Sequence, residues 1–197
     1  AALLLAIVPY AVAWVRTAPD KQFVGYVYNP ADAASYLAKM RLGWLGQWRF
    51  RLMFTPEKQS GAYLFLFHLG LGRLARGLGA PLAAVYHAAR LLGCVVLLAA
   101  LGWLCQIALP EGRARRWGYA FALFGGGIGW AFVWTDPLPV DVWVPEGYVF
   151  YSILANAHFP WAQALLLLIL VLTALWRSGS VPARYALPAM ALMLVVL

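Results

Sequence analysis

Long apolar runs separated by short polar intervals form the main pattern of this sequence. A helix needs about 20 apolar residues to cross the hydrocarbon core of a bilayer. Residues 83–109, 117–135 and 160–176 meet or approach that length without an acidic residue, so each is predicted to form a membrane span. The apolar runs at 1–15 and 185–197 are predicted to be parts of two further spans. The pattern therefore predicts an all-α fold, a polytopic transmembrane helix bundle.

Both ends of the sequence lie inside apolar runs. The chain begins AALLLAIV without an initiator Met, and it stops within the apolar run 187–197. We therefore expect both ends to be cut. On this interpretation residues 1–197 are a single membrane domain that belongs to a longer protein.

The longest polar interval begins at Asn29 and predicts an amphipathic helix that lies along the membrane surface. Asn29 can cap the first free N–H groups, and Pro30 suits the first helical position. Asp32 then lies in the first turn, where the helix dipole favours a carboxylate. At about 100° per residue, Asp32, Tyr36 and Lys39 share one face. The neighbouring apolar face consists of Leu37, Met40, Trp44 and Trp48.

The next apolar stretch, residues 59–72, is shorter than a membrane span. It has only 14 uncharged residues before Arg73. We predict a second amphipathic juxtamembrane helix here rather than a crossing. Without a crossing, the whole segment 16–82 is one extracytoplasmic loop that carries both interfacial helices. If residues 59–72 did cross, the bilayer would separate the polar residues before them from the polar loop 136–160.

Composition supports a membrane protein. The chain is 64% hydrophobic and 11% charged, whereas a soluble domain carries about 25% charged residues. The net charge of +8 would suggest a nucleic-acid partner in a soluble protein. In an integral membrane protein, basic residues at lipid headgroups and in cytoplasmic loops explain that charge, so no nucleic-acid partner is expected.

The distribution of basic residues predicts the orientation of the spans. Loops 111–117 and 177–184 are rich in arginine, which is typical of cytoplasmic loops. The loop 136–160 contains three acids and no Lys or Arg, and is predicted to lie outside. The basic residues in 16–58 argue against placing that segment outside as well, but the rule is weak for long segments.

Polar side chains in the predicted outer segments are the candidates for chemistry. Asp32 could act as a general base, or it could only stabilise the start of its helix. Lys58, in the turn TPEK, could bind a phosphate or lie at the lipid headgroups. Glu146 is a second acid at a predicted helix start. His158 is expected to be structural rather than a metal ligand.

Two other motif classes are not supported by the sequence. Neither an HExxH nor a CxxC pattern occurs, so no metal site is predicted. The glycine-rich run 125–129, GGGIG, lacks the Lys-Ser/Thr pair and the strand of a phosphate-binding loop. We interpret it as a place of close helix packing inside a span.

Several short motifs follow one another in a recognisable order. They are the acid in NPADAASYLAKM, the lysine turn in TPEKQSGAYLFLFHLGLG, the pair Arg90-Leu91, the basic turn GRARRWG and the acid in VPEGYVF. This order resembles the GT-C superfamily of polytopic membrane glycosyltransferases, which includes protein mannosyltransferases and lipid A aminoarabinose transferases. The resemblance covers most of residues 1–176. The chain departs from the family pattern at Ala33, Gln59 and Glu146.

The resemblance implies transfer of a sugar from a polyprenyl-phosphate donor to an unidentified acceptor, at the outer face of a prokaryotic cytoplasmic membrane. Asp32 and Glu146 would be the catalytic acids, with Asp32 deprotonating or orienting the acceptor hydroxyl. Lys58 and Arg90 would neutralise the leaving phosphate. Further substrate contacts are expected at Tyr36, Lys39, Asp141 and His158. No certain cofactor is implied, and a divalent metal stays open.

Two other functions compete with sugar transfer. A transporter or flippase would favour ionisable residues deep inside the spans, and the predicted spans after residue 90 contain almost none. In a non-catalytic scaffold or assembly subunit, Asp32 would only stabilise its helix. Asp32→Asn keeps much of the capping function but removes a base, so an activity assay of this variant distinguishes the two roles of Asp32.

Overall fold

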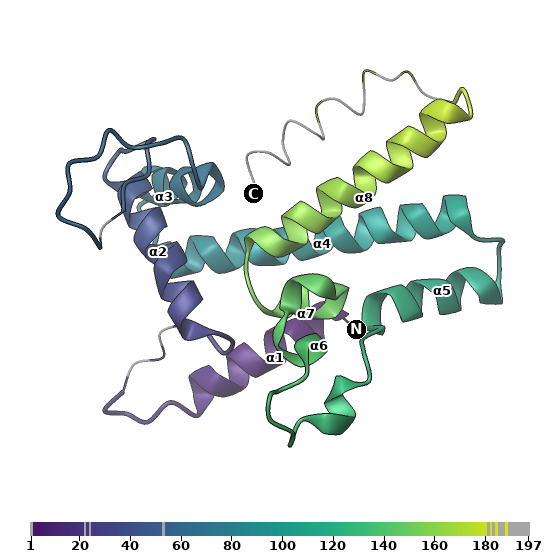
Figure 1. The fold of residues 1–197 in the computed structure, drawn as a ribbon, viewed down its shortest axis with the longest axis horizontal. Coiled ribbons are helices and arrows are strands. Elements are labelled where there is room, and N and C mark those ends of the chain that lie inside the picture. The colour runs from purple at the N-terminus through teal and green to yellow at the C-terminus, as the bar shows by residue number, and fades with distance from the viewer. Residues whose placement is uncertain are drawn as a thin grey trace.

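The structure of the chain is a computed structural model that describes residues 2–21, 23, 25–52, 54–180, 182, 184 and 188. Within this part every named element is a helix, as the apolar pattern predicted (Figure 1). The predicted partial span 185–197 lies outside the described residues, except for position 188. The elements are α1 (Ala2–Val15), α2 (Pro30–Trp44), α3 (Leu66–Leu78), α4 (Leu82–Ala108), α5 (Arg113–Phe124), η1 (Gly129–Phe132), α6 (Val140–Trp143), η2 (Pro145–Gly147), α7 (Val149–Leu154) and α8 (His158–Arg177).

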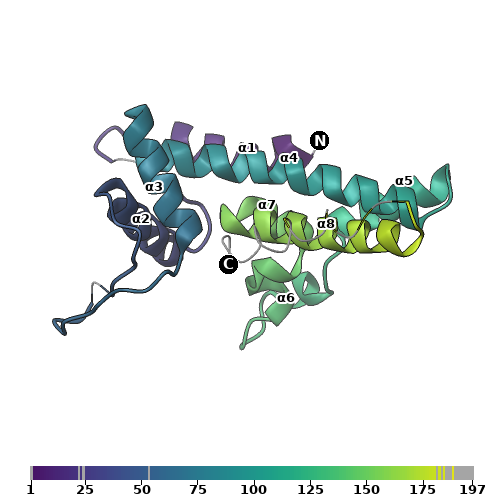
Figure 2. The ribbon, with the colours of Figure 1, turned by 90° about the horizontal axis from the view of Figure 1, so that it is seen from above.

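The two long helices α4 and α8 form the axis of the fold. They have 27 and 20 residues and are long and apolar enough to cross a membrane, since they measure about 40 and 30 Å. They lie side by side and run in the same direction (Figure 1, Figure 2). The Trp161 indole Nε1–H donates to the Ala89 carbonyl at 2.8 Å. Gly93 allows this approach, because a side chain there would meet the Trp161 ring.

Buried side chains form two apolar clusters along α4, one at its start and one from Cys94 to Cys105. The cluster from Cys94 onward is the first; it joins α1, α4, α5, α7 and α8, and the second joins α2 and α3 to the start of α4. The first includes Ala6, Cys94, Leu97, Ile153 and Ala164, and the second includes Ala33, Met40, Ala75, Val85 and Tyr86. The α2–α3 pair is thus packed against the end of α4 at which α8 also begins.

The predicted span over residues 117–135 is not one helix. α5 ends at Phe124, and the backbone from Gly125 to Gly127 is irregular before the short helix η1. Each glycine in a helix costs about 0.5–1 kcal/mol relative to alanine, so three in a row favour a break. The interpretation of this run as a helix-packing motif inside a span was therefore wrong.

α3 begins later than the apolar stretch 59–72 that predicted it and continues past that stretch to Leu78. It begins at Leu66 and has 13 residues, about 20 Å of helix, against a hydrocarbon core of about 30 Å. It lies across α2 with their backbones in close contact. A methyl group at Gly43 would overlap the Leu69 carbonyl, and one at Gly72 would overlap the Met40 carbonyl.

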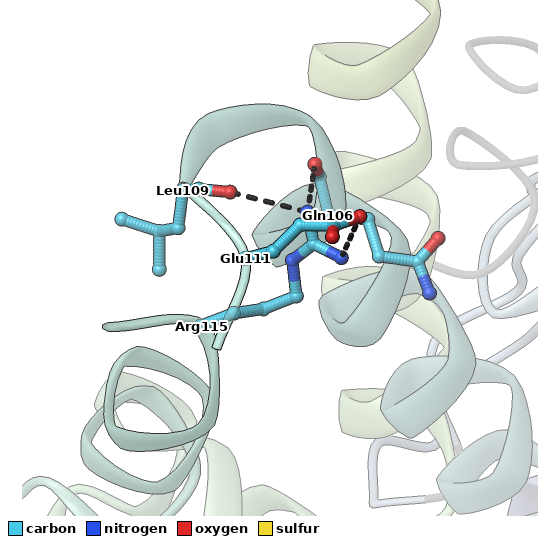
Figure 3. A network of polar contacts seen from close by, with 4 residues as sticks. All are labelled: Gln106, Leu109, Glu111 and Arg115. Atoms are coloured by element: carbon cyan, nitrogen blue, oxygen red, sulfur yellow. Dashed lines mark hydrogen bonds and ion pairs between the residues drawn. The ribbon is translucent and has the colours of Figure 1, made fainter. Parts of the chain in front are cut away.

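Arginine side chains bind the carbonyl groups at two helix ends, where no helical N–H is left to pair with them. Arg73 of α3 donates to the Gly46 carbonyl just after α2 at 2.6 Å. Arg115 donates to the carbonyls of Gln106 and Leu109, at 3.2 and 3.3 Å, and pairs with Glu111 at 3.7 Å (Figure 3). Arg115 thereby closes the turn between α4 and α5.

The close α2–α3 contact predicts that Gly72→Ala destabilises the chain. The added methyl group must push the two backbones apart, which costs about 1–3 kcal/mol or more. The free energy of unfolding in mixed detergent micelles, followed by circular dichroism, measures the loss. Gly77→Ala is the matched control, because no atom lies within 4 Å of a methyl group at that position of α3. Equal stability of the two variants would contradict the proposed contact.

Candidate functional site

The start of α2 presents Asp32 at the surface. Pro30 is the first helical residue and Asp32 lies in the first turn, as predicted. Asn29 occupies the N-cap position, but its side chain makes no capping hydrogen bond, and its φ of 39° is left-handed. Its amide Nδ2–H instead donates to the Asp32 carboxylate at 2.5 Å. The predicted capping by Asn29 was therefore wrong, and the residue holds the carboxylate instead.

Tyr36 lies one turn after Asp32 and contacts two histidines. Its ring stacks on His68 of α3, with centroids 4.6 Å apart, and meets the edge of His158 of α8 at 4.7 Å. The two histidine rings are 5.0 Å apart. This group of three rings, which we call the tyrosine–histidine cluster, joins α2, α3 and α8. His68 was not predicted as a site residue, although it is the one histidine in the apolar stretch 59–72.

His68 is held in a neutral state. Its side chain is 2% exposed, and neither ring nitrogen has a hydrogen-bond partner among the described residues. Burial, followed by the nearby His158 and Lys39, lowers the pKa of His68 from 6.5 to about 2. His68 therefore has unpaired polar atoms facing the interior of the cluster.

Lys39 completes the same face of α2. Its ammonium group lies over the rings of Tyr36 and Phe65, 4.6 and 4.0 Å from their centroids, and donates to Ser35 Oγ at 3.1 Å. Burial lowers the pKa of Lys39, and the charge of Asp32 opposes that shift. Lys39 thus lies between aromatic rings and makes no ion pair with Asp32 in the described part of the chain.

Glu146 is brought to the same region from the second half of the chain. It lies exposed in η2, and its backbone carbonyl accepts a hydrogen bond from Gln163 of α8 at 2.8 Å. Nearby, the hydroxyl of Tyr28 donates to the Trp143 carbonyl at 2.8 Å. These contacts connect the segment before α2 with the segment before α8.

The charges of Asp32 and Glu146 act on the pKa of two tyrosines, Tyr36 and Tyr28. Burial and the charges of Asp32 and Glu146 raise the pKa of Tyr36 to about 12. Burial, followed by Glu146, Tyr151 and Asp32, also raises the pKa of Tyr28. The charges of Asp32 and Glu146 therefore affect the same two hydroxyl groups, which the sequence could not establish. Tyr28 was not predicted, because nothing in its local sequence marks it.

The two predicted phosphate ligands lie apart from this region. Lys58 is exposed in the long segment between α2 and α3, which projects away from the helices (Figure 2). Arg90 is 2% exposed and donates to the Ile153 carbonyl at 2.8 Å, with its guanidinium 4.1 Å from the centre of the Tyr10 ring. The structure thus gathers Asp32, Glu146 and the tyrosine–histidine cluster, but not Lys58 or Arg90.

Two further features of the candidate site are Asp141 and the side chains that could bind a metal ion. Asp141 lies in α6, accepts a hydrogen bond from the Gly129 N–H at 2.7 Å and lines a cavity between α5 and α7. Among the described residues, no group of three or more His, Cys, Asp or Glu side chains could hold a metal ion.

The lowered pKa of His68 predicts a loss of stability in acid. Below pH 6.5 the unfolded chain binds a proton at this site while the folded chain does not, down to about pH 2. One such proton changes the free energy of unfolding by about 1.4 kcal/mol per pH unit. His68→Phe keeps an aromatic ring and should lose that part of the slope when unfolding is measured over the two pH units below 6.5. Identical slopes for the two proteins would show that His68 does not cause it.

Comparisons with protein-family models, with curated proteins and with solved structures gave no match for this chain.

Proposed function

We propose that this chain is the membrane part of a GT-C-type glycosyltransferase, which transfers a sugar from a polyprenyl-phosphate donor to an acceptor at the outer face of a prokaryotic cytoplasmic membrane. The observation that carries the proposal is that contacts between distant segments bring Asp32 and Glu146 to one region: Tyr28 donates to the Trp143 carbonyl, and Tyr36 meets His158 at the start of α8. Two carboxylates in one region suit general acid–base chemistry on a hydroxyl substrate.

In the proposed reaction Asp32 is the general base. Its carboxylate takes the proton from the acceptor hydroxyl as the oxygen attacks the anomeric carbon, and the phosphate leaves with the electron pair of the broken bond. Glu146 positions the acceptor from the opposite side. The ammonium group of Lys39, held between aromatic rings on the same face as Asp32, supplies positive charge near the leaving phosphate.

The proposal changes the expected roles of the other two cations. Lys58 would reach the phosphate only after the segment between α2 and α3 folds toward α2, because that segment projects outward (Figure 2). The guanidinium of Arg90 is enclosed by Ile153 and Tyr10, so its role in this proposal is to hold the helices together. Direct contact with a phosphate would require that junction to open.

The distribution of charge along α4 and α8 supports the proposed orientation. Both helices begin near α2 and α3 and end at the opposite side of the fold (Figure 1). Arg113, Arg115 and Arg116 follow the end of α4, and Arg177 ends α8. The arginines at that end favour a cytoplasmic basic turn. The basic residues of 16–58 lie at the other end, where the rule is weak because the segment is long.

The acid pair predicts that Asp32→Asn and Glu146→Gln each reduce sugar transfer. Asparagine keeps the size of the residue and its hydrogen-bonding capacity but removes the base, so the rate should fall about 10²- to 10⁴-fold. The assay follows labelled sugar from a panel of polyprenyl-phosphate donors, in membranes that contain the full-length protein. Asp20→Asn, which changes an exposed acid before α2, should keep the rate. Full activity of Asp32→Asn would show that Asp32 is not the catalytic base.

The proposed orientation predicts the pattern of thiol labelling in intact cells. Cys94 and Cys105 are buried and are first replaced by Ala. Single cysteines then replace the exposed residues Ser60, Leu78, Ala114 and Gly147. A membrane-impermeant thiol reagent should label positions 60, 78 and 147, and should label position 114 only after permeabilisation. Labelling of 60 and 78 from opposite sides would mean that α3 crosses the membrane, which would exclude a shared site.

A further inference from the structure

A cavity of about 340 Å³ lies between the C-terminal end of α5, the glycine segment after it, and α6 and α7. That volume is at the lower end of the range for small-molecule sites, about 300–1,000 Å³. The residues that decide its chemistry are Phe124, Trp130, Asp141, Tyr148, Phe150 and Tyr151. Five of these six side chains are aromatic, and the sixth is a carboxylate.

The Asp141 carboxylate is fixed at the cavity wall. One of its oxygens accepts the hydrogen bond from the Gly129 N–H at 2.7 Å. Glycines at 127 and 129 leave room for it, since a methyl group at either position would overlap the carboxylate. The break in the predicted span 117–135 therefore places the glycine backbone next to the Asp141 carboxylate.

No ion pair with Asp141 is found in the part of the chain that the structure describes. The sequence from Gly118 to Trp176 contains neither Lys nor Arg. The one ion pair found among the described residues is the distant contact between Arg115 and Glu111. A half-buried carboxylate without such an ion pair favours a ligand that brings positive charge, because screening by water is reduced there.

The aromatic side chains add attraction for a positive ligand. The rings form two pairs: Phe124 and Phe150 with centroids 5.5 Å apart, and Tyr148 and Tyr151 with centroids 6.1 Å apart. The exposed indole of Trp130 lines the same space. Aromatic faces carry partial negative charge and bind ammonium groups, most strongly when the ring is Trp.

We propose that this cavity binds an ammonium group, either primary or quaternary, with Asp141 as its counter-charge and the aromatic rings around it. The group could belong to a soluble amine or to the headgroup of a zwitterionic lipid, and both present the same chemistry to the site. Neither Asp32 nor Glu146 lines this cavity, so the proposal does not depend on sugar transfer.

The test compares two ligands of the same shape. Choline and its uncharged carbon analogue, 3,3-dimethyl-1-butanol, are titrated into the full chain in polyoxyethylene detergent micelles, and binding is followed by saturation-transfer NMR. Choline should bind about tenfold or more tightly than the analogue. Equal binding of the two ligands would overturn the proposal. It would also be overturned if a neutral methyl glycoside saturated the site and choline did not compete with it. This comparison needs no variant that could fail to fold.

Two substitutions then locate the binding. Asp141→Asn keeps an acceptor for the Gly129 N–H and should weaken choline binding about tenfold or more. Asp136→Asn removes an exposed acid of the same loop that does not line the cavity, and should leave binding unchanged. Unaltered affinity in Asp141→Asn would overturn the assignment.

Nanodiscs distinguish the two sources of the ammonium group. If a lipid headgroup occupies the cavity, choline binding should be weaker in phosphatidylcholine discs than in phosphatidylglycerol discs. The same titrations with Asp141→Asn measure the attraction of choline to the anionic lipid itself, and this part is subtracted. If the ligand is a soluble amine, the part of the binding that depends on Asp141 should be the same in both discs.

Discussion

The buried guanidinium of Arg90 is the contact on which the arrangement of this fold depends. It projects from α4, donates to the Ile153 carbonyl of α7 and lies over the Tyr10 ring of α1. Tyr10 in turn donates its hydroxyl hydrogen to the Leu154 carbonyl at 2.6 Å. Burying a charged group costs several kcal/mol unless polar partners surround it. The three helices meet at this point, where the guanidinium has the Ile153 carbonyl and the Tyr10 ring as partners, while its Nε–H has no hydrogen-bond partner among the described residues.

The same junction sets the position of the candidate site. α7 leads directly into α8, and this turn is held by Tyr86 of α4, which donates to Asn156 and accepts from the Ala157 N–H, both at 3.1 Å. His158 follows at once and contacts Tyr36. Such hydrogen bonds are strong in an apolar interior. Contacts that fix α7 to α4 thus also determine where the first turn of α8 meets α2.

Glycine plays three different structural roles in this chain. Gly43 and Gly72 let two helix backbones touch, the run from Gly125 ends a helix, and Gly129 makes room for a carboxylate. A single property, the absence of a side chain, underlies all three. Which role applies depends on the neighbouring segment, and that is why the run in the middle of an apolar stretch was misread as a helix-packing motif.

The sequence alone determined the features that depend on neighbouring residues: the all-helical fold, the two long apolar helices α4 and α8, the start of α2 at Pro30 and the place of Asp32 in its first turn. These follow from hydrophobic length and from the local chemistry of helix ends. Tertiary structure decided the burial of Arg90, the stacking of His68 on Tyr36 and the approach of Glu146 to Tyr28. Each of these joins residues distant in the sequence, and such contacts are chosen by packing across the whole fold, which a local pattern does not contain.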